Sequence, residues 1–120
     1  MGWITELPEG YSIDRSHLTS HPVAGITTLL QALADPLRLD LVRDLAASPE
    51  PRPCGSLVQP VTKSTLSHHL RVLREAGLIE HRLEGTTKLT SLRRAEVDAA
   101  YPGLLDSVLR APVGEPATVL

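Results

Sequence analysis

The sequence is poor in aromatic residues and cysteine, and it has no long apolar run. It contains no phenylalanine, and its aromatic residues are Trp3, Tyr11 and Tyr101. This shortage argues against binders of single-stranded nucleic acid, which stack bases on aromatic side chains. The single cysteine, Cys54, excludes an internal disulfide and a multi-thiolate zinc site, so we expect a reducing cytoplasm. No apolar run approaches the ~18 residues of a membrane-spanning helix, and residues 1–6 lack the basic start of a signal peptide.

The length of the chain, 120 residues, fits one domain and excludes a two-domain enzyme with an interdomain cleft. We divide it into an N-terminal arm (1–21), one folded domain (22–110) and a flexible tail (111–120). A core this small, built mainly of Leu, Val, Ala and Ile, is marginal, so we expect self-association. No Gly-x-Ser-x-Gly elbow, phosphate loop or His-Glu-x-x-His motif is present, so we predict that the protein is not an enzyme.

The basic residues are concentrated in one part of the chain. The net charge of the whole is −2, but residues 62–94 carry a net charge of +4. Residues 1–61 and 95–120 each carry a net charge of −3. A basic segment between acidic flanks favours a polyanionic partner, although a solvated face with scattered charges is the alternative interpretation.

The apolar spacing and the capping residues predict mainly helix, with a β-hairpin before the last helix. Pro22 suits the first turn of a helix over 22–34, and Asp35-Pro36 caps a second over 36–47. Alternating prolines then favour an extended connector. The remaining expectations are a short helix over 54–59, a helix over 63–76 between Thr62 and Gly77, strands over 78–82 and 88–92, a turn at 84–87, and a last helix from Arg94 that is kinked or broken at Pro102-Gly103. This order is that of a winged helix-turn-helix.

The helix over 62–76 has two different sides. At 100° per residue, Leu66, Leu70 and Leu73 share one side, with His69 beside them. The opposite side collects Ser64, Ser67, His68, Arg71 and Glu75. Small hydroxyl residues near the N-terminus let the backbone approach a duplex, and Ser, His and Arg can reach base edges in the major groove. The backbone N–H groups of the first turn, with Lys63, would suit phosphates.

Two segments resemble the ArsR/SmtB family of bacterial winged-helix repressors. They are Ala34-Asp35-Pro36-Leu37-Arg38-Leu39 and the run from Ser67-His68-His69-Leu70 to Ala76-Gly77-Leu78-Ile79, and the resemblance spans about residues 22–110. It implies a homodimer that binds operator DNA, with 62–76 as the recognition helix and the hairpin as the wing. By position, Ser64, Ser67 and His68 match the groove-facing residues of the family. Arg71 is added from the helical wheel, and His69 is expected to be packed inside.

The full set of expected contacts follows from this interpretation. The expected DNA-binding residues are Thr62, Lys63, Ser64, Ser67, His68, Arg71, Arg74, Arg82 and Lys88. The family often has arginine after the glycine of the wing, whereas this sequence has Thr86 there, and Glu84 would repel phosphate. Arg82 and Lys88 are therefore expected to make the wing contacts. The expected dimer interface uses the apolar stripes of 22–34 and 95–110, namely Leu29, Leu30, Tyr101, Leu104, Leu105 and Val108. Pairing across a two-fold axis would place two recognition helices roughly 34 Å apart, on an inverted repeat.

The effector is not identified by the residues. Family members release DNA on binding a metal ion or on a thiol change, but the Cys-x-Cys pair of the family is reduced here to Cys54. The last helix offers Asp98 and Asp106 and no histidine. The main interpretation of Cys54 is a small buried hydrophobic residue. A site for nickel, zinc or cobalt formed by Cys54 with His17 and His21 is a minor alternative, and oxidation of Cys54 is another. A winged helix that binds protein instead of DNA is the other alternative.

Overall fold

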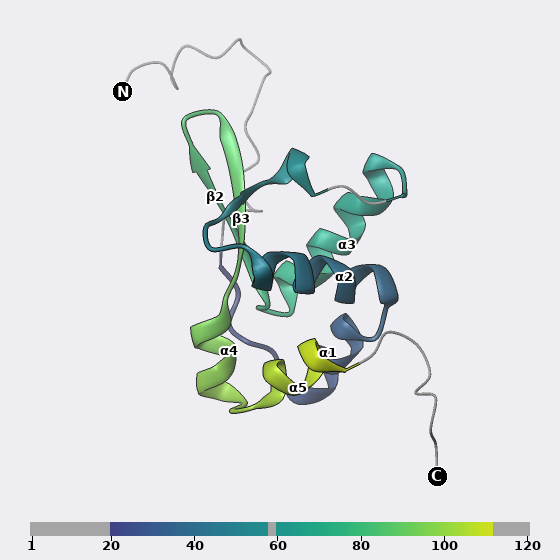
Figure 1. The fold of residues 1–120 in the computed structure, drawn as a ribbon, viewed down its shortest axis with the longest axis vertical. Helices are drawn as coiled ribbons and strands as arrows, with labels where there is room; N and C mark the ends of the chain where they lie inside the picture. The colour runs from purple at the N-terminus through teal and green to yellow at the C-terminus, as the bar shows by residue number, and fades with distance from the viewer. Residues whose placement is uncertain (1–19, 58–59, 112–120) are drawn as a thin grey trace.

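A computed structural model describes residues 20–57 and 60–111, so most of the arm and tail, with His17, lie outside the described residues. The elements in chain order are α1 (Ile26–Leu33), α2 (Pro36–Ala47), β1 (Arg52–Pro53), the 3₁₀ turn η3 (Cys54–Ser56), α3 (Lys63–Glu75), β2 (Ile79–Glu84), β3 (Thr87–Leu92), α4 (Arg94–Ala100) and α5 (Leu104–Arg110). In space, α1, α4 and α5 lie at one end of the molecule, and the hairpin of β2 and β3 projects at the other (Figure 1).

The two predicted N-caps are confirmed. The Asp35 carboxylate accepts hydrogen bonds from the backbone N–H groups of Leu37 (2.8 Å) and Arg38 (3.1 Å), with Pro36 at the first helical position of α2. The Thr62 hydroxyl accepts from the backbone N–H of Thr65 at 3.2 Å and starts α3. Each cap satisfies N–H groups that have no partner inside the helix, so the sequence defines both starting points locally.

The predicted start of the first helix at Pro22 is wrong, because α1 begins at Ile26. The residues before it form an extended segment along the end of α3. The backbone N–H of Ala24 donates to the carbonyl oxygen of Ala76 at 3.0 Å, and the Tyr101 hydroxyl donates to the carbonyl oxygen of Ala24 at 2.8 Å. These bonds, made to distant parts of the chain, hold residues 22–25 extended.

The predicted hairpin is confirmed, and its strands are longer than expected. Ile79 lies opposite Leu92 and Glu84 opposite Thr87, which leaves a two-residue turn that begins at Gly85 with φ +64°. A glycine at this position suits a two-residue hairpin. The sheet also contains β1, which pairs antiparallel with β3 and was not predicted, so its strand order is β1-β3-β2.

Two short segments differ in detail from their predictions. The expected helix over 54–59 is the single 3₁₀ turn η3, and residues 58–59 lie outside the described part. The expected break at Pro102-Gly103 is confirmed: α4 ends at Ala100 and α5 begins at Leu104. Gly103 makes this turn with φ +84°, a conformation that L side chains rarely adopt.

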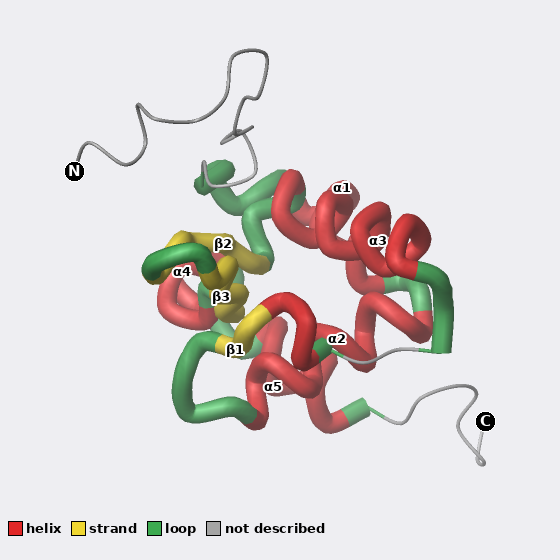
Figure 2. Tube along the Cα trace, turned by 90° about the horizontal axis from the view of Figure 1, so that it is seen from above, coloured by secondary structure: helices red, strands yellow, loops and turns green. Residues whose placement is uncertain are grey.

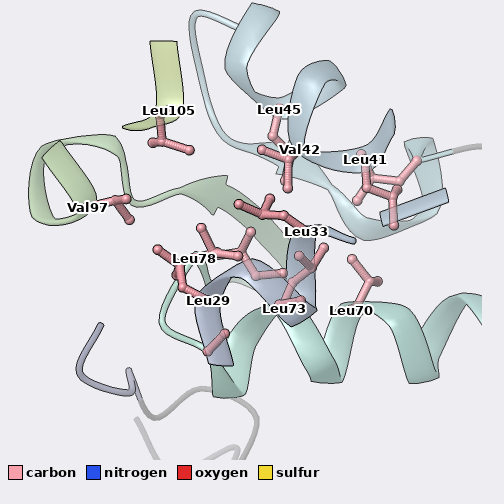
Figure 3. Close-up of a cluster of buried hydrophobic side chains, with 14 residues drawn as sticks. Leu29, Leu33, Leu41, Val42, Leu45, Leu70, Leu73, Leu78, Val97 and Leu105 are labelled. Atoms are coloured by element: carbon pink, nitrogen blue, oxygen red, sulfur yellow. The ribbon is translucent and has the colours of Figure 1, made fainter. Parts of the chain in front are cut away.

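The core is a cluster of apolar side chains, mainly leucine, to which each of the helices α1 to α5 contributes (Figure 3). Leu41, Val42 and Leu45 of α2 face Leu33 of α1 and the buried leucines of α3. Leu29 and Leu105, which were expected in a dimer interface, are fully buried inside this core, so that expectation is corrected. The apolar stripes of the first and last helices therefore find partners within one protomer, and only their edges are accessible.

Candidate nucleic-acid interface

The outward side of α3 is accessible along its whole length. Ser64, Ser67, His68, Arg71 and Glu75 are all exposed. The other side of the same helix is buried, with Leu70 and Leu73 in the core. The two-sided pattern read from the sequence is therefore confirmed, and α3 presents hydroxyl, imidazole and guanidinium groups to solvent.

The N-terminal turn of α3 is also open to solvent. Thr62, Lys63 and Ser64 are exposed, and the Thr62 hydroxyl lies 3.2 Å from the Ser64 hydroxyl and 3.0 Å from that of Thr65. The first backbone N–H groups of a helix and its dipole favour an anion at this end. With the Lys63 ammonium beside them, these groups suit a phosphate.

His68 and Arg71 form a pair on the outward face. The Arg71 Nη2 lies 3.3 Å from the His68 Nδ1. A guanidinium only donates hydrogen bonds, so the His68 Nδ1 accepts here, and in the neutral ring the proton is on Nε2. The pair therefore offers an imidazole N–H and the remaining guanidinium N–H groups as donors, which match the acceptor edge of a guanine.

His69 lies on the inward side, as predicted, and is only 8 % exposed. Its Nδ1 is 3.1 Å from the Nη1 of Arg38, at the start of α2. Sequence reasoning missed Arg38 as a partner of α3. The sequence shows Arg38 only as one residue of the segment Ala34–Leu39, and nothing in that segment indicates a contact with α3.

Arg74 is corrected as an expected DNA contact. It is 8 % exposed, and its Nη1 lies 3.1 Å from the Nε2 of His21. Arg74 follows Leu70 by four residues and therefore shares its inward side. That spacing was the signal that could have excluded it.

The wing carries its two expected cations on different faces. Arg82 is exposed and Lys88 is half-buried. Arg82 lies opposite Leu89, whereas Lys88 lies opposite Leu83, the next residue along β2. Because neighbouring residues of a strand point to opposite faces, the two cations do not form one patch. Glu84 is exposed at the turn beside them.

Of the candidate metal ligands, His21 and Cys54 lie among the described residues, and they contact different groups. The ring of His21 contacts Arg74, while the Cys54 Sγ lies 3.3 Å from the Thr90 Oγ1 on β3. Within residues 20–57 and 60–111, no three His, Cys, Asp or Glu side chains are grouped to hold a metal ion. Thr90 also contacts the His81 Nδ1 at 2.8 Å, a contact that the sequence did not reveal.

The accessible apolar side chains of the helical end lie mainly on α1. Ile26 is 42 % exposed and Leu30 is 44 % exposed, one helical turn apart. At the other expected interface helices, Tyr101, Leu104 and Val108 are half-buried against the core. These five residues are the members of the two apolar stripes that remain available for a partner.

Known proteins resemble this chain in sequence and in fold. Residues 33–82 match the family model described as a helix-turn-helix domain. The HTH-type transcriptional regulator YceK of Bacillus subtilis is 35 % identical over 82 residues, which cover 67 % of this chain and 82 % of that protein. The HTH-type transcriptional regulator NmtR of Mycobacterium tuberculosis is 34 % identical over 101 residues, 84 % of this chain and 81 % of the other.

Two solved structures show the same fold. An ArsR-like transcriptional regulator from Rhodococcus superposes with a TM-score of 0.56 at 23 % identity, over 68 % of this chain and 76 % of the other. A homodimeric winged helix-turn-helix DNA-binding domain from Mycobacterium bovis gives a TM-score of 0.53 at 24 % identity, over 76 % and 87 %. No helix among the described residues is long and apolar enough to cross a membrane.

The fold and the accessible face of α3 define a winged helix-turn-helix protein, in which α3 has the position of the recognition helix and β2–β3 that of the wing. The similarity to the two regulators covers most of their length as well as most of this chain. The chain belongs to the ArsR/SmtB family of transcriptional regulators.

Proposed function

We propose that the protein is a sequence-specific repressor that binds an inverted-repeat operator in duplex DNA as a homodimer. The observation that carries this proposal is the side of α3 opposite the leucines, where all five outward residues are exposed, namely Ser64, Ser67, His68, Arg71 and Glu75. A helix kept on the surface only for solubility would more often show Glu and Lys at four-residue spacing. Here serines at the N-terminal end leave room for the backbone to approach bases.

Each group has a distinct role in the proposed complex. Ser64, Ser67, His68 and Arg71 contact base edges in the major groove, which is wide enough for a helix. Thr62, Lys63 and the first N–H groups of α3 contact phosphates. Arg82 and Lys88 reach the backbone from the two faces of the wing. Arg74 has no role in this interface because it is buried.

A two-fold axis completes the proposed site. Ile26 and Leu30 of α1, with the half-buried Tyr101, Leu104 and Val108, would be covered by a second copy of the chain. Large exposed apolar side chains on a small domain favour such an interface. The axis would place two α3 helices about one DNA turn, roughly 34 Å, apart, so that each reads one half-site.

The experiment is a titration of a labelled duplex from the region upstream of the protein's own gene, followed by fluorescence anisotropy in a series of salt concentrations. If each protomer neutralises about four phosphates, log K against log salt should fall with a slope near −7. A scrambled duplex of equal length should bind at least about a thousand-fold more weakly. A slope near zero, with no preference for either duplex, would contradict DNA binding and favour a winged helix that binds protein.

A further inference from the structure

The guanidinium of Arg38 links the first helix to the recognition helix. Its Nε donates to the carbonyl oxygen of Ala32 at 2.7 Å, and its Nη2 donates to that of Gln31 at 3.2 Å. Its Nη1 lies 3.1 Å from the Nδ1 of His69 in the middle of α3. One planar group on α2 thus holds the last turn of α1 on one side and α3 on the other, two helices that lie side by side in Figure 2.

The contact with Arg38 indicates which nitrogen of His69 accepts. Because a guanidinium only donates, the His69 Nδ1 accepts this hydrogen bond, and in the neutral ring the proton is on Nε2. The ring is buried, and it lies next to the exposed ring of His68, with 5.5 Å between the ring centroids. His69 therefore connects Arg38 to the helix segment that carries the outward face.

Three sets of contacts hold α3 in the protomer. Its C-terminal end is tied to the segment before α1 by the hydrogen bond from the Ala24 N–H to the Ala76 carbonyl oxygen and by the contact between Arg74 and His21. Along its length it packs through leucines, and such apolar contacts are not directional. The bond from Arg38 to His69 is directional, so it restricts the angle of α3 about the tied end.

We propose that Arg38 and His69 are positioning residues that set the angle between α1 and α3, and that they thereby determine which half-site spacing the dimer accepts. This inference rests on the proposed function, in which α1 lies at the two-fold axis and α3 in the groove. Adding one base pair between half-sites rotates them by about 35° relative to each other, since a turn holds 10–10.5 base pairs. A fixed angle in each protomer therefore selects one spacing.

The test uses the full chain and inverted repeats whose half-sites are kept and whose spacer is changed by one or two base pairs in either direction. Wild type should show one sharp optimum. Arg38→Lys keeps the charge but loses the fork, and His69→Leu loses the acceptor. In both, affinity at the optimum should fall about tenfold, the effect of losing one hydrogen bond to a charged group, while affinity at the other spacings stays almost unchanged. The spacing profile should therefore flatten.

His69→Asn is the matched control, because the Asn side-chain oxygen can take the place of the Nδ1 acceptor. It should keep the sharp profile. Melting temperature and sedimentation are recorded for each variant. If Arg38→Lys or His69→Leu fails to fold, Arg38→Gln is used in its place. A ¹⁵N spectrum of the histidine rings without DNA should show the Nε2–H form of His69 in wild type.

Three results would count against this account. An unchanged spacing profile in Arg38→Lys and His69→Leu, with wild type binding normally, overturns the inference alone. An equal loss of affinity at every spacing, in step with the fall in melting temperature, also overturns it, because the two residues would then be merely structural. Failure of wild type to bind any of the inverted repeats overturns the proposed function first.

Discussion

Gly77 lies so close to Pro22 that a Cβ atom on this glycine would be 2.4 Å from the Pro22 carbonyl oxygen. It would also lie 2.6 Å from the Val23 Cα, and both of these are backbone atoms. Gly77 ends the turn after α3 with φ +81°. The segment before α1 can therefore cross the end of α3 only because residue 77 has no side chain.

Gly77→Ala should destabilise the protein by about 3 kcal/mol, because the strain of the left-handed conformation adds to a clash with rigid backbone. The measurement is urea unfolding followed by circular dichroism. The matched control is Gly103→Ala, which has φ +84° and open space around its Cβ position, and it should cost only about 1–2 kcal/mol. Equal losses in the two variants would mean that the close approach to Pro22 contributes nothing.

Asp35 should make the stability of the protein dependent on pH. Burial raises the pKa of Asp35, but the backbone N–H donors of Arg38 and Leu37, together with the positive charge of Arg38, outweigh burial, so the pKa lies below its usual value. A carboxyl whose folded pKa is lowered contributes stability above its unfolded pKa, about 4, and loses that contribution as the pH falls through the folded value.

Asp35→Ala should therefore cost about 1 kcal/mol at pH 7 and much less well below pH 4. Unfolding by urea at a series of pH values measures the difference from wild type. Asp40→Ala, which removes an exposed carboxylate from the same helix, serves as the control. A difference that stays constant down to pH 2 would show that the charge of Asp35 is irrelevant to the cap.

Leu30→Glu should separate the proposed dimer while leaving the protomer folded. Leu30 is 44 % exposed, so a charge there is solvated in the monomer but would be buried without a partner in the interface. Sedimentation equilibrium should show the dimer dissociation constant raised by at least about a hundred-fold. Thr28→Glu, an exposed position on another side of α1, should have little effect. Similar dimers in wild type and Leu30→Glu would place the interface elsewhere.

Arg71→Ala and Ser67→Ala should each reduce affinity for the cognate duplex by about 1–3 kcal/mol and flatten the preference among bases at one position of each half-site. Both side chains are exposed on the outward side of α3. Arg110→Ala removes the same charge from an exposed arginine of α5 and is the control for Arg71→Ala. If affinity fell uniformly on all duplexes, Arg71 and Ser67 would be phosphate contacts.

The parts of the fold that were predicted correctly depend on neighbours in sequence. The caps at Asp35 and Thr62, the stop at Gly77, the hairpin and the break at Gly103 each follow from a few adjacent residues. The two sides of α3 follow from helical spacing, and the exposure of every outward residue agrees with it.

The features that were missed depend on distant parts of the chain. The start of α1 is set by a hydrogen bond from Ala24 to Ala76, and β1 exists only because β3 lies beside Arg52 and Pro53. An apolar stripe does not distinguish a protomer core from a dimer interface, which is why Leu29 and Leu105 were misplaced. The role of Arg38 depends on three helices meeting at one side chain, a relationship that spacing along the chain does not reveal.

The most direct test of the central claim, that a pair of α3 helices reads duplex DNA, is selection of bound sequences from a pool of random duplexes by the full-length protein. We expect enrichment of an inverted repeat whose half-site centres are about 10 base pairs apart. The same selection with Arg71→Ala should lose one base preference in each half-site. Enrichment of no sequence, or of a single unpaired site, would contradict the account.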